Sequence, residues 1–257
     1  ASALAAIARP GWLITVPANI DDEVWLQHAW RNRLQSLVLL AAMALFLALL
    51  GQLLWGISGL VILLIAGGMM VWFNPALSPR LVMRMYRARA VGPRQAPVLW
   101  QLLAQLTERA GLPHQPDLYY VPSRMLNAFA VGSKRNPAIA ITDGLLRQLS
   151  TRELIGVLAH EISHIRSNDL WVMGLADMFS RGTSLLSLMG QLLLLLNLPL
   201  ILLTDFSINW FAIILLIFAP TISALAQLAL SRTREYDADL GAARLTGDPE
   251  GLAHALA

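Results

Sequence analysis

The stretch that decides the fold is Ser150-Thr-Arg-Glu-Leu-Ile-Gly-Val-Leu-Ala-His-Glu-Ile-Ser-His164, which contains the pattern H-E-x-x-H. Its apolar residues recur at helical spacing, so the pattern predicts a helix with one buried face. Ser150 is a favoured N-cap residue, and Glu153 falls three positions later, where a capping-box carboxylate reaches back to the N-cap backbone. The stretch therefore predicts a capped helix that begins just after Ser150.

This helix carries a candidate metal site. His160 and His164 are four residues apart, about one helical turn, so both imidazoles leave the same face. Two nitrogen ligands on one face suit a tetrahedral zinc ion. Glu161 is rotated by about 100° from His160, so its carboxylate can reach a water at the metal without binding the metal itself. Ordinary core histidines are the alternative, and the intervening glutamate on a capped helix argues against them.

The composition indicates a membrane protein. Of 257 residues, 56% are hydrophobic and only 14% are charged, whereas soluble domains have about 25% charged residues. The chain has no Cys, so neither a disulfide framework nor a thiolate zinc site is possible. Any zinc ion must therefore be held by histidines and carboxylates.

Four uncharged stretches are each long enough to cross about 30 Å of hydrocarbon as a helix. They are residues 34–54, 55–73, 185–203 and 208–230. A buried hairpin in a soluble core is the alternative for the first pair, but about 40 consecutive uncharged residues argue against it. The sequence thus predicts two membrane hairpins, and the lipid bilayer is a predicted partner.

The distribution of positive charge predicts the orientation of these spans. All 19 Lys and Arg residues lie before residue 34, between residues 73 and 185, or after residue 230. By the positive-inside rule these three segments are cytoplasmic. The basic run that follows residue 73 is better explained by topology or anionic lipid headgroups than by nucleic acid, which we do not expect as a partner.

The segment between the two hairpins predicts a small α+β domain. Residues 97–110 form an amphipathic helical pattern, and residues 118–121, 128–131 and 139–141 are short β-like runs. We expect two or three strands in one small sheet. The fold class is therefore α+β, mainly α: a four-helix integral membrane protein whose cytoplasmic zincin-like catalytic domain bears a small β-sheet.

Five segments follow from these observations. They are a cytoplasmic N-terminal prelude (1–33), a transmembrane hairpin (34–73), the cytoplasmic catalytic part (74–184), a second transmembrane hairpin (185–230) and a cytoplasmic helix (231–257). The catalytic part contains the helix with His160-Glu-Ile-Ser-His164, called here the HEISH helix.

The third metal ligand should be distant in sequence from the HEISH helix but on a rigid element. Glu235 fits best, because it lies on the helical continuation of the last apolar span among other polar residues. Asp239 lies one turn further along the same face, where it could accept a hydrogen bond from a zinc-bound imidazole and fix its tautomer. The alternative is a solvated, snorkelling end of a membrane helix.

Three motifs of the chain, and the order in which they occur, resemble those of one protein family. Ser231-Arg-Thr-Arg-Glu-Tyr-Asp-Ala-Asp239 resembles the motif S-R-x-R-E-x-x-A-D, Asn127-Ala-Phe-Ala-Val-Gly132 resembles a strand N-A-F-A-x-G, and the segment from His160 to His164 matches a zinc helix. Together with the four-span layout, they resemble the HtpX-type integral-membrane zinc metalloproteases, relatives of the CAAX prenyl proteases. The resemblance covers roughly residues 34–250.

The resemblance assigns roles to particular residues. It implies that Glu235 is the third zinc ligand and that Asp239 forms a hydrogen bond with a side chain that binds the zinc ion. It also implies that the backbone of Asn127, Ala128, Phe129 and Ala130 forms the edge along which an extended substrate pairs.

The chain departs from the family at its two ends. Its prelude of 33 residues is longer than the short start that is typical of the family. The chain stops at Ala257, where family members usually continue into a helical segment with a His-Pro motif. We therefore expect this chain to be truncated.

The predicted function is a zinc endopeptidase with one Zn²⁺ per chain, held by His160, His164 and Glu235, and with Glu161 as the general base. It would cleave misfolded or membrane-associated proteins on the cytoplasmic side of a bacterial inner membrane, as part of membrane protein quality control. One alternative is an inactive zinc-binding membrane scaffold, which would have no use for Glu161. Another is a protease for lipidated, prenyl-type peptides.

Overall fold

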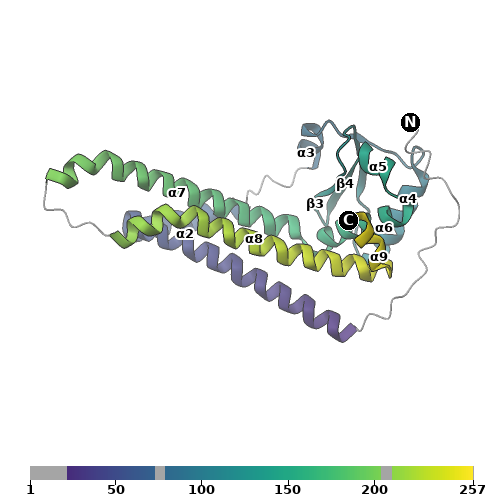
Figure 1. The fold of residues 1–257 in the computed structure, drawn as a ribbon, viewed down its shortest axis with the longest axis horizontal. Helices are drawn as coiled ribbons and strands as arrows, with labels where there is room; N and C mark the ends of the chain where they lie inside the picture. Colours follow the sequence, from purple (N-terminus) through teal and green to yellow (C-terminus); the bar gives the residue numbers. More distant parts are fainter. Residues whose placement is uncertain (1–21, 73–78, 204–209, 257) are drawn as a thin grey trace. The chain divides into compact units, whose positions relative to one another are not determined.

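The computed structural model describes residues 22–72, 79–203 and 210–256 (Figure 1). The chain divides into two compact units. The first, called here the sheet unit, comprises the described residues 22–32, 79–171 and 234–256. The second, the helical unit, comprises the described residues 33–72, 172–203 and 210–233.

The first helix, α2 (Asp22–Trp72), is interrupted at Gly56, whose φ of 62° and ψ of −148° are not helical. A side-chain Cβ at Gly59 would clash with the carbonyl oxygen of Gly51. In a straight helix these two residues would be about 12 Å apart, so the chain folds back on itself at Gly56. The predicted boundary between the first two apolar stretches therefore coincides with a reversal of the chain.

Most residues of two more long helices belong to the helical unit: α7 (Asp169–Leu203) and α8 (Trp210–Thr246). The first three residues of α7 and the residues of α8 from Arg234 onward belong to the sheet unit. Three helical segments, residues 30–65, 169–199 and 210–246, are long and apolar enough to cross a membrane by length and composition. The predicted tight turn at residues 204–207 lies outside the described residues. The division of the first segment into two membrane crossings stays a prediction.

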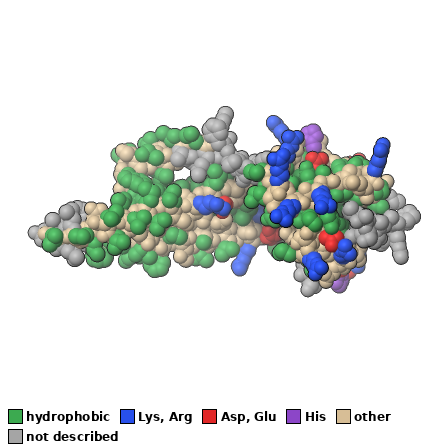
Figure 2. Space-filling view, turned by 90° about the horizontal axis from the view of Figure 1, so that it is seen from above, with side chains coloured by type: hydrophobic (Ala, Val, Ile, Leu, Met, Phe, Trp, Pro, Cys, Tyr) green, Lys and Arg blue, Asp and Glu red, His purple; other side chains and the backbone are tan. Residues whose placement is uncertain are grey.

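The surface of the helical unit is apolar. Among its described residues the only charged side chains are those of Arg33, Asp177, Arg181 and Arg232. Large hydrophobic side chains are exposed along its helices, and hydrophobic side chains cover most of the surface of these helices in Figure 2. Such a surface suits hydrocarbon rather than water.

The sheet unit contains a mixed four-stranded sheet in the order β1-β2-β4-β3. The strands are β1 (Arg89–Ala90), β2 (Asp117–Val121), β3 (Ala128–Ser133) and β4 (Asn136–Thr142). β2 and β4 are parallel, whereas β1 and β3 run antiparallel to their neighbours. The three predicted strands are confirmed. The fourth, β1, has only two residues, too few to give a periodic pattern. β3 lies at an edge of the sheet.

The described part of the sheet unit also contains five shorter helices. They are α3 (Pro79–Met85), α4 (Pro97–Ala110), α5 (Asp143–Gln148), α6 (Thr151–Ser167) and α9 (Pro249–Leu256). The predicted amphipathic helix is α4, with the bounds expected from the sequence. α6, which carries H-E-x-x-H, packs against α4, α9 and β3. It is therefore the central element of this unit.

The apolar face of α6 lies in the main core. Leu158 and Ile162 are fully buried there, together with Leu103 of α4 and Ile139 of β4. α9 approaches α6 closely at Gly156, where a Cβ would lie 2.8 Å from the backbone nitrogen of Leu252. The core thus fixes one face of α6 and leaves the opposite face, with its histidines, for other contacts.

Both ends of α6 are defined by local hydrogen bonds. The predicted capping box is present: Glu153 N–H donates to Ser150 Oγ over 3.4 Å, and Ser150 N–H donates to Glu153 Oε2 over 2.7 Å. At the other end Asn168 adopts the left-handed conformation, with a φ of 57°. The chain turns there, and α7 begins at the next residue, Asp169.

Candidate metal centre

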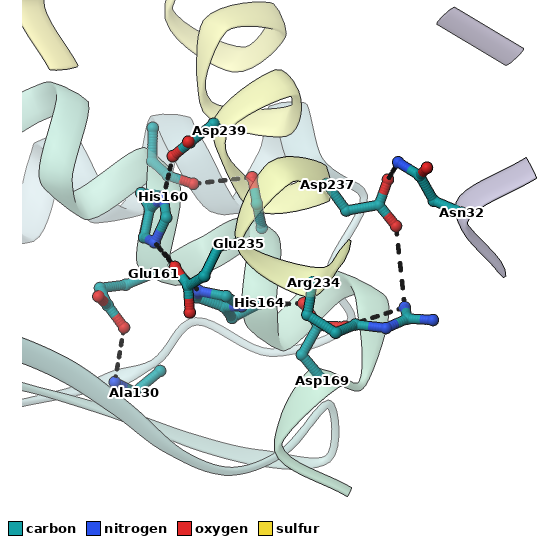
Figure 3. Close-up of polar contacts among 12 residues, drawn as sticks. Asn32, Ala130, His160, Glu161, His164, Asp169, Arg234, Glu235, Asp237 and Asp239 are labelled. Carbon is teal, nitrogen blue, oxygen red and sulfur yellow. Dashed lines mark hydrogen bonds and ion pairs between the residues drawn. The ribbon is translucent and has the colours of Figure 1, made fainter. Parts of the chain in front are cut away.

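Three side chains from α6 and α8 converge in the sheet unit (Figure 3). The Nε2 atoms of His160 and His164 are 3.0 Å apart, and Oε2 of Glu235 lies 3.3 Å from the first and 3.7 Å from the second. A tetrahedral zinc ion with ligands at about 2.0–2.1 Å separates its ligand atoms by about 3.3 Å. The three distances therefore match three corners of such a tetrahedron, and the sequence-predicted ligands come together.

A carboxylate faces the other ring nitrogen of each histidine. His164 Nδ1 is 2.8 Å from Asp169 Oδ2, and His160 Nδ1 is 2.9 Å from Asp239 Oδ1. The second pair is close but poorly aligned for a hydrogen bond. A carboxylate at Nδ1 favours the tautomer that keeps the proton there and leaves the Nε2 lone pair free. The Nε2 lone pairs of His160 and His164 then face each other beside the carboxylate of Glu235. A cation between these groups would stabilise this arrangement, so the residues fit a metal ion.

Asp169 is the buried end of a longer polar chain. Its side chain is only 3% exposed, and Arg234 Nη1 donates to its Oδ1 over 3.1 Å. Arg234 also lies 3.8 Å from Asp237, which accepts a hydrogen bond of 2.6 Å from Asn32 on α2. A buried carboxylate is stable only when it is paired in this way. The chain of contacts therefore holds Asp169 in place behind His164 (Figure 3).

The surroundings of His164 favour positive charge. Burial on its own lowers the pKa of this imidazole, but the carboxylates of Asp169 and Glu235 outweigh burial and raise the pKa to about 10. The same negative charges that hold a proton on His164 would attract a metal cation to this position.

Glu161 lies beside the ligands but is not one of them. It is 9% exposed, and its Oε2 accepts a hydrogen bond of 2.8 Å from the backbone N–H of Ala130 on β3. Burial is the main reason that the pKa of Glu161 is raised. A buried carboxyl group that can take up a proton next to a metal position has the properties of a general base.

The open edge of β3 runs past this glutamate. Asn127, just before the strand, bonds to Thr142: Thr142 N–H donates to the Asn127 carbonyl, and Asn127 N–H donates to Thr142 Oγ1. Antiparallel pairs alternate between bonded and non-bonded, so Ala128 and Ala130 direct their backbone groups away from β4. Ala128, Phe129 and Ala130 lie on this edge strand and Asn127 directly precedes it. That a substrate pairs with these residues stays a prediction. The ring of Phe129 lies 4.8 Å from that of Tyr86, between centroids.

Sequence reasoning identified five of the residues gathered here: His160, Glu161, His164, Glu235 and Asp239. It missed Asp169 and Arg234. The one available indication for Asp169 was its place directly after the HEISH helix. The residue before it, Asn168, is of a type that often ends helices in the left-handed conformation. The indication for Arg234 was its fixed position in the motif S-R-x-R-E-x-x-A-D. The motif does not say what the guanidinium contacts, because the contact with Asp169 spans 65 residues of sequence.

Comparison with known proteins places this centre in a family. Residues 93–257 match peptidase family M48. A protease HtpX homolog from Desulfatibacillum aliphaticivorans is 39% identical over 236 residues, which cover 88% of this chain and 73% of the relative. A protease HtpX homolog from Pelotomaculum thermopropionicum is 40% identical over 230 residues, which cover 88% of this chain and 80% of the relative. No solved structure matches the chain significantly.

These matches include both halves of the candidate metal centre. The matched residues 93–257 contain the HEISH helix and Glu235. The similarity to HtpX homologs covers most of the chain and therefore extends into the apolar helices. The chain belongs to peptidase family M48 and is a membrane metalloprotease of the HtpX type.

Proposed function

We propose that this metalloprotease uses one zinc ion, held by His160, His164 and Glu235, to cleave unfolded or membrane-associated polypeptides on the cytoplasmic side of a bacterial inner membrane. The observation that carries the zinc assignment is the spacing of 3.0, 3.3 and 3.7 Å between the three ligand atoms. Zinc suits a site of two imidazoles and one carboxylate in a chain without Cys.

Glu161 is the group that moves the proton in this proposal. A zinc ion at the site would supply a Lewis acid that polarises the scissile carbonyl and activates water. The Glu161 carboxylate accepts a proton from the attacking water and then delivers it to the leaving amine. Its burial supports this role, because a raised pKa lets the carboxyl group hold the proton between the two steps.

The substrate is bound as an added strand along β3. Ala128 offers both its backbone groups and Ala130 offers its carbonyl, because β4 does not use these groups. The N–H of Ala130 donates to Glu161, which places the strand directly beside the proposed base. Strand addition recognises the backbone of an extended peptide more than its side chains. A folded domain has few such segments available, so this mode of binding favours unfolded substrates and supports a role in membrane protein quality control.

The cytoplasmic orientation rests on charge. All 19 Lys and Arg residues lie outside the two predicted hairpin turns of the membrane part, which by the positive-inside rule puts the sheet unit in the cytoplasm. The exposed apolar surface of the helical unit supports its insertion into the bilayer.

The test is to measure metal content and cleavage of an unfolded fluorogenic protein together, for the wild type and Glu161→Gln in detergent. We expect one zinc per chain in both proteins and cleavage by the wild type alone. Glu153→Gln is the matched control, because it makes the same change on the same helix away from the metal site, and it should still cleave. Full activity in Glu161→Gln would exclude Glu161 as the base, and the absence of zinc from both proteins would exclude the metal site.

A further inference from the structure

A pocket of about 620 Å³ opens beside the metal centre. Its volume is in the range of ligand pockets, about 300–1,000 Å³. The lining includes the apolar residues Ile165, Leu170 and Trp171, and Ser133 also lines the pocket. Arg135 also borders the pocket, but this residue is exposed, so water screens its charge. The pocket therefore suits an apolar group.

Three elements of the site meet at this pocket. Gly132 and Ser133 are the last residues of β3, His164 and Ile165 belong to α6, and Trp171 lies at the start of α7. His164 is thus both a wall of the pocket and a proposed metal ligand. The pocket and the metal centre therefore share one residue.

The register of β3 leads an extended peptide to the pocket. Ala128, Ala130 and Gly132 alternate along the strand, and Gly132 faces Pro137 of β4, which has no N–H to donate. Gly132 is buried and its φ of 99° is not that of a regular strand, so the pairing edge ends at this residue, where the pocket begins. A strand rises about 3.3 Å per residue, so the distance from Ala130, beside Glu161, to Ser133 is about 10 Å. A substrate paired with Ala130 reaches the pocket within about three of its residues.

We propose that this pocket is a side-chain subsite of the enzyme and that it takes a large apolar side chain, such as Leu, Phe or Met, from a residue within three positions of the scissile bond. This inference rests on the proposed function. It adds a side-chain preference to a binding mode that otherwise depends on the backbone. Apolar side chains are buried in folded proteins and become available when a protein unfolds, so such a subsite favours unfolded substrates.

The experiment uses the full chain, loaded with zinc in detergent, and a set of fluorogenic peptides in which each position from three before to three after the scissile bond is changed to Leu, Phe, Gly or Asp. We expect one position at which Leu or Phe exceeds Gly and Asp by at least about 10-fold in kcat/KM, the discrimination that an apolar pocket provides. Binding of the same peptides to Glu161→Gln, measured by fluorescence anisotropy without cleavage, should show a preference at the same position.

Two substitutions change the pocket in opposite directions. Trp171→Ala removes an apolar wall and should reduce the preference for Leu over Gly by at least about threefold. Ser133→Phe fills the pocket and should shift the preference toward Gly. Trp30→Ala is the matched control, because Trp30 is 70% exposed and does not line the pocket, and it should keep the wild-type preference. Each preference is a ratio within one protein, so partial loss of folded enzyme does not alter it.

The outcomes separate the two proposals. If zinc-loaded wild type cleaves none of the peptides and no unfolded protein, both the proposed function and the subsite assignment are overturned. If it cleaves peptides without preference at any position, or if both pocket variants keep the wild-type preference, the subsite assignment alone is overturned.

Discussion

The two histidines of the metal centre each face a carboxylate, but the two sides of the centre are built differently. On the buried flank, His164 bonds to Asp169, whose side chain is 3% exposed and bonded to Arg234. On the exposed flank, His160 faces Asp239, whose side chain is 47% exposed and poorly aligned for a hydrogen bond. The buried flank is fixed by the protein interior, whereas the exposed flank can adjust. We infer that the buried flank sets the position of the metal.

The largest expected effect comes from breaking the buried flank. Asp169→Ala leaves the guanidinium of Arg234 buried without the carboxylate at 3.1 Å, and removal of one partner of a buried ion pair costs about 3–5 kcal/mol. Unfolding of the metal-free protein in detergent should show a loss of this size. Asp239→Ala is the matched variant on the exposed flank and should cost less than about 1 kcal/mol. Equal losses in the two variants would contradict the contrast between the flanks.

A milder change sharpens the comparison at the level of metal affinity. Asn in place of Asp keeps the shape of the side chain but removes the negative charge that orients the imidazole. We expect Asp169→Asn to weaken zinc binding by about 10- to 100-fold and Asp239→Asn to weaken it less, as measured by competition with a chromogenic chelator. A larger loss in Asp239→Asn would show that the exposed flank dominates.

A modest effect, on stability alone, should come from the start of α6, away from both flanks. Ser150→Ala removes the side-chain acceptor of the capping box, which costs about 1 kcal/mol of stability. Thermal unfolding should detect this loss, and Ser150→Asp should restore most of it, because Asp is also a good N-cap. Zinc affinity should stay unchanged in both variants. A loss of affinity in Ser150→Ala would mean that the position of the histidines depends on the helix start.

The contrast between the flanks also marks what the sequence could predict. Two parts of the centre follow helical periodicity: Glu235 and Asp239 are one turn apart on α8, as His160 and His164 are on α6, so spacing predicted each pair. The expectation that the two pairs meet came from the polar surroundings of Glu235 and from the family resemblance. The buried flank does not follow helical periodicity, because Asn168 turns the chain in the left-handed conformation between His164 and Asp169. Beyond such a turn, a fixed rotation per residue no longer indicates where a side chain points.

The same distinction holds for the fold. The α6 capping box, the amphipathic helix α4 and three strands depend on local patterns, and all were predicted from the sequence. The order of the sheet, with parallel β2 and β4 adjacent, and the pairing of Arg234 with Asp169 depend on contacts between distant segments. No periodicity encodes these contacts, which form only when the tertiary structure does.

X-ray absorption at the zinc edge of the loaded wild-type protein tests the central claim, that His160, His164 and Glu235 hold one metal ion. The account predicts two imidazoles at about 2.0–2.1 Å, with oxygen completing a four-coordinate shell. Glu235→Ala should keep both imidazoles but lose one oxygen ligand and much of the affinity. A third imidazole, supplied by any of the other three of the five histidines in the chain, or a shell of oxygen alone, would contradict it.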